Sequence, residues 1–348
     1  MPAMFRLATY NVEWFNALFD DNGQLLPDDA PGGRHGVSRA RQVAALARVF
    51  AAIDADAVLV VEAPNEGRRR STVRALENFA AAFGLRTRSA LMGFASETEQ
   101  ELALLYDPGR VAAVHDPQGP ARGRRGQDRA PRFDGVFRID LNADGQVDHV
   151  RFARPPLELV LRPAGGGQAL RLIGVHLKSK APHGARNPEA AHAIALANRR
   201  KQLAQCLWLR ARVEDHLAAG DSLIVLGDLN DGPGLDEYEN GFGQSGVEVV
   251  MGLDAAPALR LHDPNARRAL HHPLAAAPTS SRFWLAEEGR YLSALLDYIM
   301  VSPDLCARDP RWRIWHPFED PQCWEDAGLR DALLAASDHF PVTLDLAL

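Results

Sequence analysis

A succession of short apolar segments, each bounded by turn-forming residues, runs through the whole chain. Segments of this length are typical of buried strands, because a helix of a globular protein needs a longer periodic pattern. We expect strands at residues 5–10, 57–61, 86–93, 101–106, 157–162, 169–176, 222–227, 295–301 and 340–346. Helical patterns occupy residues 38–53, 70–83 and 188–219. Strands interleaved with helices predict an α/β fold.

The 348 residues contain no repeat at solenoid spacing and no low-complexity tail, which favours one continuous domain over residues 1–348. The least regular stretch, residues 116–150, holds a basic run (RGRRGQDRAPR, 122–132) and an acidic run (DLNADGQVD, 140–148). Mixed charge together with glycine and proline is typical of surface loops. We therefore interpret residues 116–150 as a surface insertion.

Composition argues against several classes of protein. No apolar run approaches the roughly 20 residues of a membrane helix, so no membrane partner is expected. The first residues lack the basic and apolar regions of a secretory signal, and the three cysteines are far apart, so we expect a cytoplasmic protein. A net charge of −6 argues against coating nucleic acid through the overall field. Nothing in the sequence indicates an obligate protein partner.

Most predicted strands carry an Asn, Asp, Glu or His residue at one end or just beyond it. These residues are Asn11, Glu13, Glu62, His176, Asp228, Asn230, Asp297, Asp338 and His339. A single Asp or Asn after a strand is usually turn chemistry or a helix cap. Ordinary turns would also include Ser, Gly and Pro, whereas here carboxylates, carboxamides and imidazoles predominate. This set suits Mg²⁺ or Mn²⁺ and does not suit a thiolate-bound metal.

Seven segments contain these residues and a neighbouring arginine, in the order TYNVEWF, VLVVEAPN, FARPPLEL, GVHLKSK, VLGDLND, LDYIMVS and ASDHFPV. In this order they resemble the endonuclease/exonuclease/phosphatase family of metal-dependent phosphoesterases, from residue 5 to residue 346. That family includes pancreatic-type deoxyribonuclease, exonuclease III-like abasic-site endonucleases, neutral sphingomyelinases and inositol polyphosphate 5-phosphatases. The resemblance implies a four-layer α/β sandwich, with two mixed β-sheets packed face to face and helices outside.

The resemblance also implies a divalent metal, Mg²⁺ or Mn²⁺, bound by oxygen-bearing side chains. Glu62 is then the principal ligand, with Asn11 beside it. Glu13 stands where some family members carry a second acidic ligand, and Asp338 is a further contributor. These four residues form the expected metal side of the site.

The other strand-end residues would then catalyse an in-line attack of water on a phosphoester. Asp228 would orient or deprotonate the water, and Asn230 would donate to the phosphoryl oxygens as charge builds. His339 would act as a base or as a charge stabiliser, with Asp297 fixing its tautomer. His176 corresponds to the second histidine of the deoxyribonuclease-like branches.

Two basic residues are expected to contact substrate phosphate. Arg154 resembles the arginine that the deoxyribonuclease-like branches use against phosphate, and Lys178 belongs to a HxKS run common in bacterial members. A solvated strand end is the alternative for Lys178 and Lys180. The chain departs from the family at Val61, where glutamine usually precedes the glutamate. It also has His176 where the abasic-site endonucleases carry tyrosine, which argues against that specialism.

Two features of the insertion suggest further ligands. DLNADGQVD has the oxygen spacing of a calcium loop, but Arg151 stands where a bidentate glutamate belongs, so an acidic turn is favoured over Ca²⁺ at 140–148. The arginines of residues 122–132 either contact a nucleic-acid backbone or are simply solvated. Aromatic residues that could stack on single-stranded bases are sparse nearby, with only Phe133 and Phe137.

Three functions compete at this stage. A divalent-metal nuclease acting on DNA, with RNA as an alternative substrate, is favoured by His176 with His339, by Arg154 and by the basic insertion. A phosphatase or phosphodiesterase for a small molecule or a lipid headgroup is favoured by the acidic net charge. A non-catalytic scaffold is the weakest hypothesis, because loss of catalysis usually erodes ligands such as Glu62.

Overall fold

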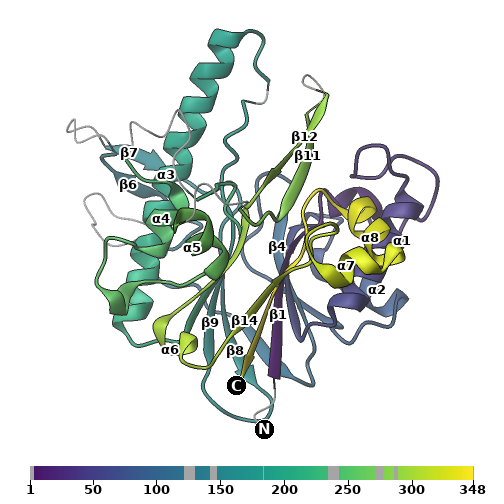
Figure 1. Cartoon of the computed structure of the whole chain (residues 1–348), viewed down its shortest axis with the longest axis horizontal. Helices are drawn as coiled ribbons and strands as arrows, with labels where there is room; N and C mark the ends of the chain where they lie inside the picture. Colours follow the sequence, from purple (N-terminus) through teal and green to yellow (C-terminus); the bar gives the residue numbers. More distant parts are fainter. Residues whose placement is uncertain are drawn as a thin grey trace.

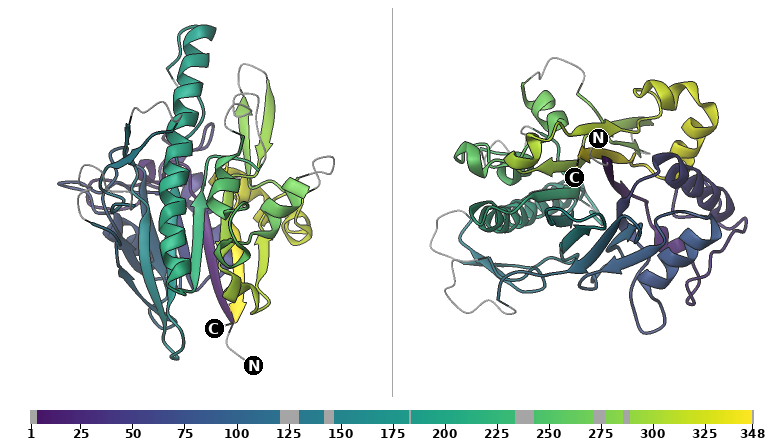
Figure 2. Two further views of the ribbon diagram at one scale, coloured as in Figure 1. Left: turned by 90° about the vertical axis from the view of Figure 1, so that its left-hand side faces the viewer. Right: turned by 90° about the horizontal axis from the view of Figure 1, so that it is seen from below.

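Two β-sheets stand face to face at the centre of the computed structural model, and helices cover their outer faces (Figures 1 and 2). The structure describes residues 4–120, 130–141, 147–182, 184–233, 243–271, 277–285 and 289–347. The arrangement is the four-layer α/β sandwich expected from the sequence. Both termini lie at the end of the sandwich opposite the β11–β12 hairpin (Figure 1).

One sheet has six strands. In order across the sheet they are β14 (Arg311–Ile314), β15 (Val342–Ala347), β1 (Met4–Asn11), β2 (Ala57–Ala63), β4 (Glu101–Tyr106) and β3 (Ser89–Met92). The central strands β1 and β2 are parallel, and all other neighbours are antiparallel. This sheet is therefore mixed.

The other sheet has five strands. In order they are β13 (Asp297–Val301), β10 (Leu223–Asp228), β9 (Leu170–His176), β8 (Leu157–Pro163) and β5 (Val111–His115). Here β9 and β10 are the parallel pair, and the remaining neighbours are antiparallel. Each sheet thus has one parallel pair, whose carboxyl ends point to the same edge.

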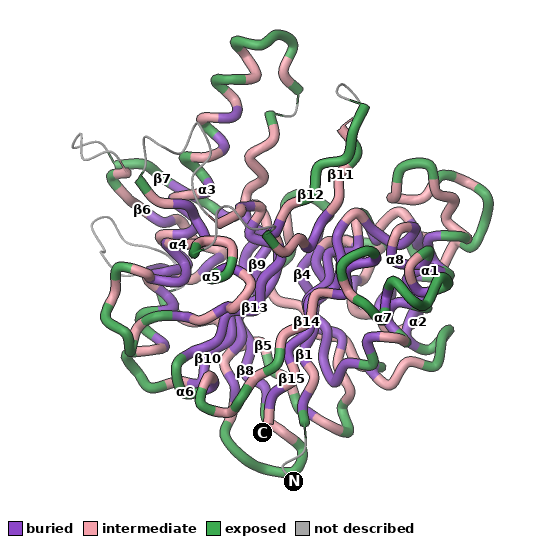
Figure 3. The backbone as a smooth tube through the Cα atoms, in the orientation of Figure 1, coloured by how far each residue is buried: buried purple, intermediate pink, exposed green. Residues whose placement is uncertain are grey.

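Aliphatic side chains fill the space between the two sheets. Leu7 and Leu59 from the six-stranded sheet belong to the same buried cluster as Leu172 and Leu226 from the five-stranded sheet. Gly174 allows the close approach, because a Cβ at that position would collide with the side chain of Leu59. The central strands are buried along their length, whereas the β11–β12 hairpin is largely exposed (Figure 3).

Helices pack on the outer face of each sheet and form two further hydrophobic clusters. The six-stranded sheet is covered by α1 (Arg39–Ile53), α2 (Thr72–Ala82), α7 (Pro321–Glu325) and α8 (Ala327–Ala336). The five-stranded sheet is covered by α3 (Pro188–Ala218), α4 (Gly246–Met251) and α5 (Pro264–His271). Three short helices remain: η1 (Phe15–Leu18), η3 (Pro257–Leu259) and α6 (Pro303–Cys306). Two small antiparallel sheets complete the described structure. One is formed by β6 (Phe137–Ile139) and β7 (Asp148–Val150), and the other by β11 (Ser281–Leu285) and β12 (Arg290–Ala294).

The nine strands and three helices expected from the sequence are all present, with small shifts at their ends. Apolar patterns in the sequence did not predict the edge strands β5 and β14, the two small hairpins or the helices other than α1, α2 and α3. These elements are short and half-exposed, so their apolar periodicity is weak. No helix in the described part of the chain combines the length and the apolar character that a membrane span requires.

Phe133 and Phe137, the two aromatic residues near the basic run, are not available to stack on bases. Both rings are buried against Trp208 of α3, with centroids 5.6 Å and 5.3 Å from the indole. Arg132 donates to Asp134 through two hydrogen bonds of 2.6 Å. The other arginines of the basic run, and the centre of the proposed calcium loop, lie outside the described residues.

Candidate active site

The carboxyl ends of the central strands of both sheets meet at one edge of the sandwich. Asn11 ends β1, His176 ends β9, and Asp228 ends β10. Asp297 begins the antiparallel strand β13 and pairs with Asp228. The Nδ2 atom of Asn11 donates to Oδ2 of Asp228 at 3.1 Å, so a direct hydrogen bond joins the two sheets at this site.

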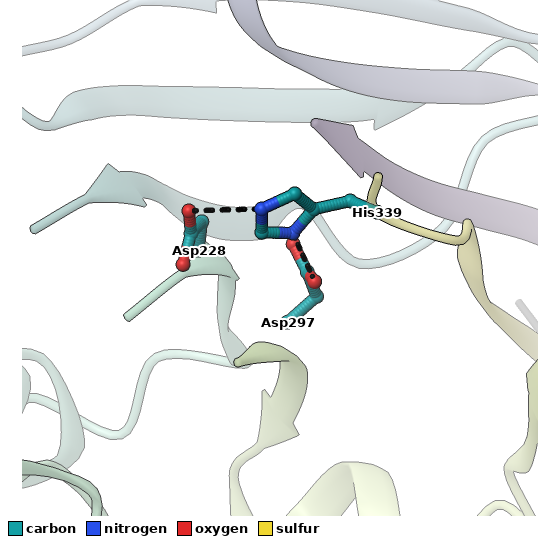
Figure 4. Close-up of side chains that lie close together, drawn as sticks. All are labelled: Asp228, Asp297 and His339. Atoms are coloured by element: carbon teal, nitrogen blue, oxygen red, sulfur yellow. Dashed lines mark hydrogen bonds and ion pairs between the residues drawn. The ribbon is translucent and has the colours of Figure 1, made fainter. Parts of the chain in front are cut away.

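His339 and Asp297 form a buried imidazole–carboxylate pair beside Asp228 (Figure 4). Nδ1 of His339 lies 2.8 Å from Oδ2 of Asp297, and Nε2 lies 3.9 Å from Oδ2 of Asp228. The hydroxyl of Ser280 donates to the same Asp297 oxygen at 2.8 Å. Burial lowers the pKa of His339, but the carboxylates of Asp297 and Asp228 outweigh burial and raise that pKa well above its ordinary value. These two carboxylates thus favour the imidazolium form of His339.

Asp228 is buried, and hydrogen bonds from Asn230 reach both of its oxygens. The backbone N–H of Asn230 donates to Oδ1 at 2.7 Å, and its carboxamide donates to Oδ2 at 3.2 Å. Burial raises the pKa of Asp228 more than the charge of His339 lowers it. Gly227 precedes this carboxylate with a φ of 131°, and a Cβ there would collide with the carbonyl oxygen of Val175. The backbone thus requires glycine at position 227, directly before the carboxylate of Asp228 that the site uses.

His176 also faces the Asp228 carboxylate, but in a different charge state from His339. Its Nε2 lies 3.6 Å from Oδ2 of Asp228 and 4.0 Å from Oε1 of Glu62. Burial lowers the pKa of His176 well below its ordinary value, and the charge of Arg154 adds to this effect. His176 is therefore neutral at physiological pH, while His339 carries a positive charge.

Glu62 lies on a β-bulge, because the register between β2 and β4 shifts between Val61 and Ala63. The φ of Glu62 is 60°, in the left-handed region that costs a non-glycine residue energy. The backbone N–H of Trp14 donates to Oε2 of Glu62 at 2.8 Å. Burial raises the pKa of this carboxyl group. A bulge re-aims a side chain, and here it directs Glu62 toward His176.

Left-handed backbone is concentrated in this site. Of the seven described non-glycine residues with positive φ, four belong to it: Glu13, Trp14, Glu62 and Asn230. Each such residue costs on the order of 1–3 kcal/mol, and proteins retain such strain mainly where function demands a particular geometry. The backbone therefore marks the same place as the polar side chains.

Glu13 and Asp338 lie together, and both contact Arg34. Nη1 of Arg34 is 3.2 Å from Oε2 of Glu13 and 3.7 Å from Oδ2 of Asp338. The backbone N–H of Asp338 donates to Glu13 at 2.9 Å. Burial, and then the charge of Asp338, raise the pKa of Glu13 to about 8. These two carboxylates thus already share one cation, a feature that the sequence analysis did not anticipate.

Arg154 is oriented by two acceptors. Nη1 donates to Oε1 of Gln100 at 2.6 Å, and Nη2 donates to the carbonyl oxygen of Leu177 at 2.8 Å. Burial lowers the pKa of Arg154, while the carboxylates of Asp228 and Glu62 raise it. Arg154 therefore lies within electrostatic reach of the same carboxylates as the histidines.

The lysines after β9 have different surroundings. The backbone N–H of Lys178 donates to Gln205 of α3 at 2.9 Å. Burial lowers the pKa of the Lys178 ammonium, and the charges of Arg154 and Lys201 lower it further. Positive charge thus gathers around Lys178, which suits an anion. Lys180 instead forms an ion pair with the buried Asp231, so it is not a solvated strand end.

The three side chains of Figure 4 offer donor atoms within 4.8 Å of one another, a spacing that could hold a metal ion. An imidazolium, however, has no free lone pair for a metal, and Nδ1 of His339 already lies 2.8 Å from Asp297. Glu62 offers a carboxylate that is only 12% exposed, beside a histidine whose pKa is lowered, and the Asn11 carboxamide adds an oxygen. Hard oxygen donors of this kind fit Mg²⁺ or Mn²⁺.

Several residues of the site could not be recognised from the sequence. Arg34 comes from an irregular loop, Gln100 precedes an ordinary strand, and Ser280 precedes a hairpin that was not expected. Each acts by holding another side chain in place, through contacts between residues far apart in the chain. A sequence motif carries no signal for such contacts.

Comparison with known proteins places this geometry in a family. The endonuclease/exonuclease/phosphatase family matches residues 8–339. Similar solved structures include the human Nocturnin catalytic domain with bound sulfate (14% identity, 98% of this chain and 93% of that chain, TM-score 0.48) and truncated Caenorhabditis elegans TDP2 (13%, 99% and 98%, 0.47). Another is an endonuclease/exonuclease/phosphatase family protein from Bacteroides thetaiotaomicron (12%, 99% and 98%, 0.48). A search of curated proteins found no match.

The family match covers nearly the whole chain, including all eleven residues expected to form the site, from Asn11 to His339. It also confirms the resemblance that the seven sequence segments suggested. The chain belongs to the endonuclease/exonuclease/phosphatase family, whose members are hydrolases that act on phosphoesters.

Proposed function

We propose that the protein is a divalent-metal-dependent nuclease that hydrolyses phosphodiester bonds of DNA, with RNA as an alternative substrate. One observation carries the proposal: His176 and His339 both face the same oxygen of Asp228, at 3.6 Å and 3.9 Å, in surroundings that lower the pKa of His176 and raise the pKa of His339. Cleavage of a diester needs a proton taken from water and charge stabilised at the phosphate and leaving group. Asp228 can take the proton, with His176 beside it in the neutral form that burial favours, and His339 can stabilise the negative charge.

Each residue has a role in this proposal. Asp228, whose pKa is raised toward the range of a useful base, orients or deprotonates the attacking water. His339 acts as a charged donor to the phosphate, and Asp297 holds its ring and its charge. Asn230 and Arg154 contact the phosphoryl oxygens. Family members generally depend on a divalent metal. Mg²⁺ or Mn²⁺ held by Glu62 and Asn11 would supply Lewis-acid polarisation of the phosphate, with Glu13 and Asp338 behind them.

A second candidate is a phosphatase or phosphodiesterase for a small molecule or a lipid headgroup. The net charge of −6 favours it, because a protein that holds a polyanion usually offers a broad basic surface. Salt separates the two candidates. Cleavage of a polynucleotide should weaken steeply as salt rises, whereas a small phosphomonoester should show a shallow response.

The test compares wild type, His339→Ala and His149→Ala, which removes an exposed histidine of β7 as a matched control. Each protein is assayed with Mg²⁺ or Mn²⁺, and with chelator, on supercoiled plasmid, linear duplex, single-stranded DNA and RNA. The proposal predicts metal-dependent cleavage by wild type and His149→Ala, and its loss in His339→Ala. If no polymer is cleaved but phosphate is released from small esters, the second candidate replaces the first.

A further inference from the structure

A surface of exposed aromatic side chains and arginines lies on the β11–β12 hairpin and beside α7, and the proposed chemistry does not use it. Four large rings there are 43–53% exposed: Trp284, Tyr291, Phe318 and Trp324. Large aromatic residues are usually covered in a soluble protein, so several on one surface indicate a binding site. In Figure 3 most residues of β12 and of α7 are coloured as exposed, and most of β11 as intermediate.

The members of this surface touch one another in a continuous series. Trp284 and Tyr291 are cross-strand partners with ring centroids 4.9 Å apart. The Arg282 guanidinium lies 3.4 Å from the Tyr291 ring centroid and 5.4 Å from that of Phe318. Phe318 lies 6.3 Å from Trp324, over which Arg330 is placed at 4.9 Å. We call these six residues the aromatic–arginine surface: Arg282, Trp284, Tyr291, Phe318, Trp324 and Arg330.

Backbone hydrogen bonds join the first residues of β11 to Asp338 and His339. Ser281 pairs with His339, and the backbone N–H of Arg282 donates to the carbonyl oxygen of Asp338 at 2.7 Å. Because side chains alternate along a strand, Phe283 points away from Arg282, and its ring packs edge-on to His339 at 5.4 Å. One face of the hairpin thus borders the catalytic site, and the opposite face carries the aromatic–arginine surface.

We propose that the aromatic–arginine surface binds unpaired bases of single-stranded nucleic acid, at the back of the hairpin whose other face borders the catalytic site. The proposal rests on the proposed nuclease function and specifies its substrate as nucleic acid with a single-stranded region. Aromatic rings stack on bases, and the interleaved guanidinium groups stack on rings and attract phosphate. A chain with net charge −6 can hold nucleic acid in this way, because stacking does not require a broad basic surface.

Other occupants fit the surface less well. A lipid surface offers charged headgroups but no planar faces for the four rings to stack on. An apolar peptide would leave Arg282 and Arg330 without anionic partners. Single-stranded nucleic acid offers planar faces and negative charge in alternation, which matches the order of rings and guanidinium groups.

The test measures binding of a fluorescein-labelled single strand and a duplex, each about 20 nucleotides long, with chelator present to prevent cleavage. Trp284→Ala and Trp324→Ala are compared with Phe83→Ala, a control ring that is 40% exposed at the end of α2. Each tryptophan change should weaken single-strand binding about tenfold, with a smaller effect on duplex, while Phe83→Ala leaves both unchanged. Hydrolysis of bis(p-nitrophenyl) phosphate by Phe83→Ala should equal hydrolysis by wild type.

Equal binding by wild type and both tryptophan variants would overturn the proposal. So would tryptophan-dependent binding to phosphatidylglycerol vesicles by a protein that ignores the oligonucleotide. Circular dichroism and thermal unfolding confirm that each variant is folded, and the two tryptophans lie on separate elements, so one misfolded variant leaves the other informative. Tryptophan-dependent strand binding without any cleavage would support this surface and refute only the proposed nuclease function.

Discussion

The two sheets are built alike but deliver different chemistry to the site. Each has one parallel pair of strands, and the carboxyl ends of both pairs meet at one edge. The six-stranded sheet and its flanking loops supply Asn11, Glu13, Glu62, Asp338 and His339. The five-stranded sheet supplies His176, Asp228, Asn230 and Asp297. We call the region of Glu62, Asn11 and Glu13 the acidic half, and the region of Asp228, Asp297 and the two histidines the imidazole half.

The halves differ in how their negative charge is balanced. Burial raises the pKa of carboxyl groups in both halves, at Asp228 as well as at Glu62 and Glu13. In the imidazole half, His339 lies beside Asp228 and Asp297, and its positive charge lowers the pKa of Asp228. In the acidic half, the histidine beside Glu62 is His176, whose pKa is lowered and whose neutral form balances no negative charge. The comparison indicates that the acidic half is where a divalent cation would be most strongly stabilised.

The largest effect is expected for Asp228→Asn in the imidazole half. The substitution keeps the shape and most hydrogen bonds but removes the base, so turnover should fall about a thousandfold. Stability should not fall, because the buried carboxylate has a raised pKa and its charge is therefore unfavourable. Turnover and thermal unfolding measured on the same preparation test both statements. Turnover within a few-fold of wild type would remove Asp228 from its role.

Asp297→Asn should lower turnover about a hundredfold and shift its pH dependence. Asp297 raises the pKa of His339, so without this carboxylate burial dominates and that pKa falls. If the imidazolium is the active form, the alkaline limb of the pH profile of kcat/KM moves to lower pH. Asp221→Asn is the control, because Asp221 contacts His216 at the same 2.8 Å away from the site. An alkaline limb at an unchanged pH would contradict the assigned role.

Glu62→Gln tests the acidic half by its metal dependence. The metal concentration for half-maximal rate should rise about tenfold or more. A readout without catalysis is the rise in unfolding midpoint on adding Mg²⁺ or Mn²⁺, which should shrink in this variant. Glu158→Gln, at a buried glutamate paired with Arg212, should leave the metal response as in wild type. An unchanged metal response in Glu62→Gln would exclude Glu62 as the main ligand.

The smallest expected effect is on stability, through Glu13. Its pKa is about 8 in the folded protein against an ordinary value of 4.5. Between these pH values the folded protein keeps a proton that the unfolded chain has released, so this group makes stability fall as pH rises. In chelator, the unfolding midpoint of Glu13→Gln relative to wild type should therefore rise by about 2 °C from about pH 5 to about pH 8. A difference that does not vary with pH would show that Glu13 titrates normally.

The strand ends were predictable from the sequence because local chemistry determines them. The apolar runs identified the strands, and parallel strands place their carboxyl ends together, so Asn11, His176 and Asp228 could be expected to meet. The bulge at Glu62 was not predictable, since VLVVEA reads as a regular strand. Nor was the contact of Arg34 with Glu13, which depends on the path of an irregular loop.

The aromatic–arginine surface could not be predicted from the sequence either. The sequence drew attention to Phe133 and Phe137, which are buried, and missed Trp284 and Tyr291, which are exposed. Whether an aromatic side chain is buried depends on packing between segments that are distant in the sequence. The sequence alone therefore does not distinguish buried from exposed aromatic residues. Hairpin β11–β12 has only five residues in each strand, which gives little periodic signal.

The most direct test of the difference between the two halves is a crystal structure of the wild-type protein soaked in Mn²⁺, with an anomalous difference map at the manganese edge. The account predicts a peak in the acidic half, beside the carboxylate of Glu62 and the carboxamide of Asn11. A peak among Asp228, Asp297 and His339, or no manganese at a concentration that supports full activity, would contradict it.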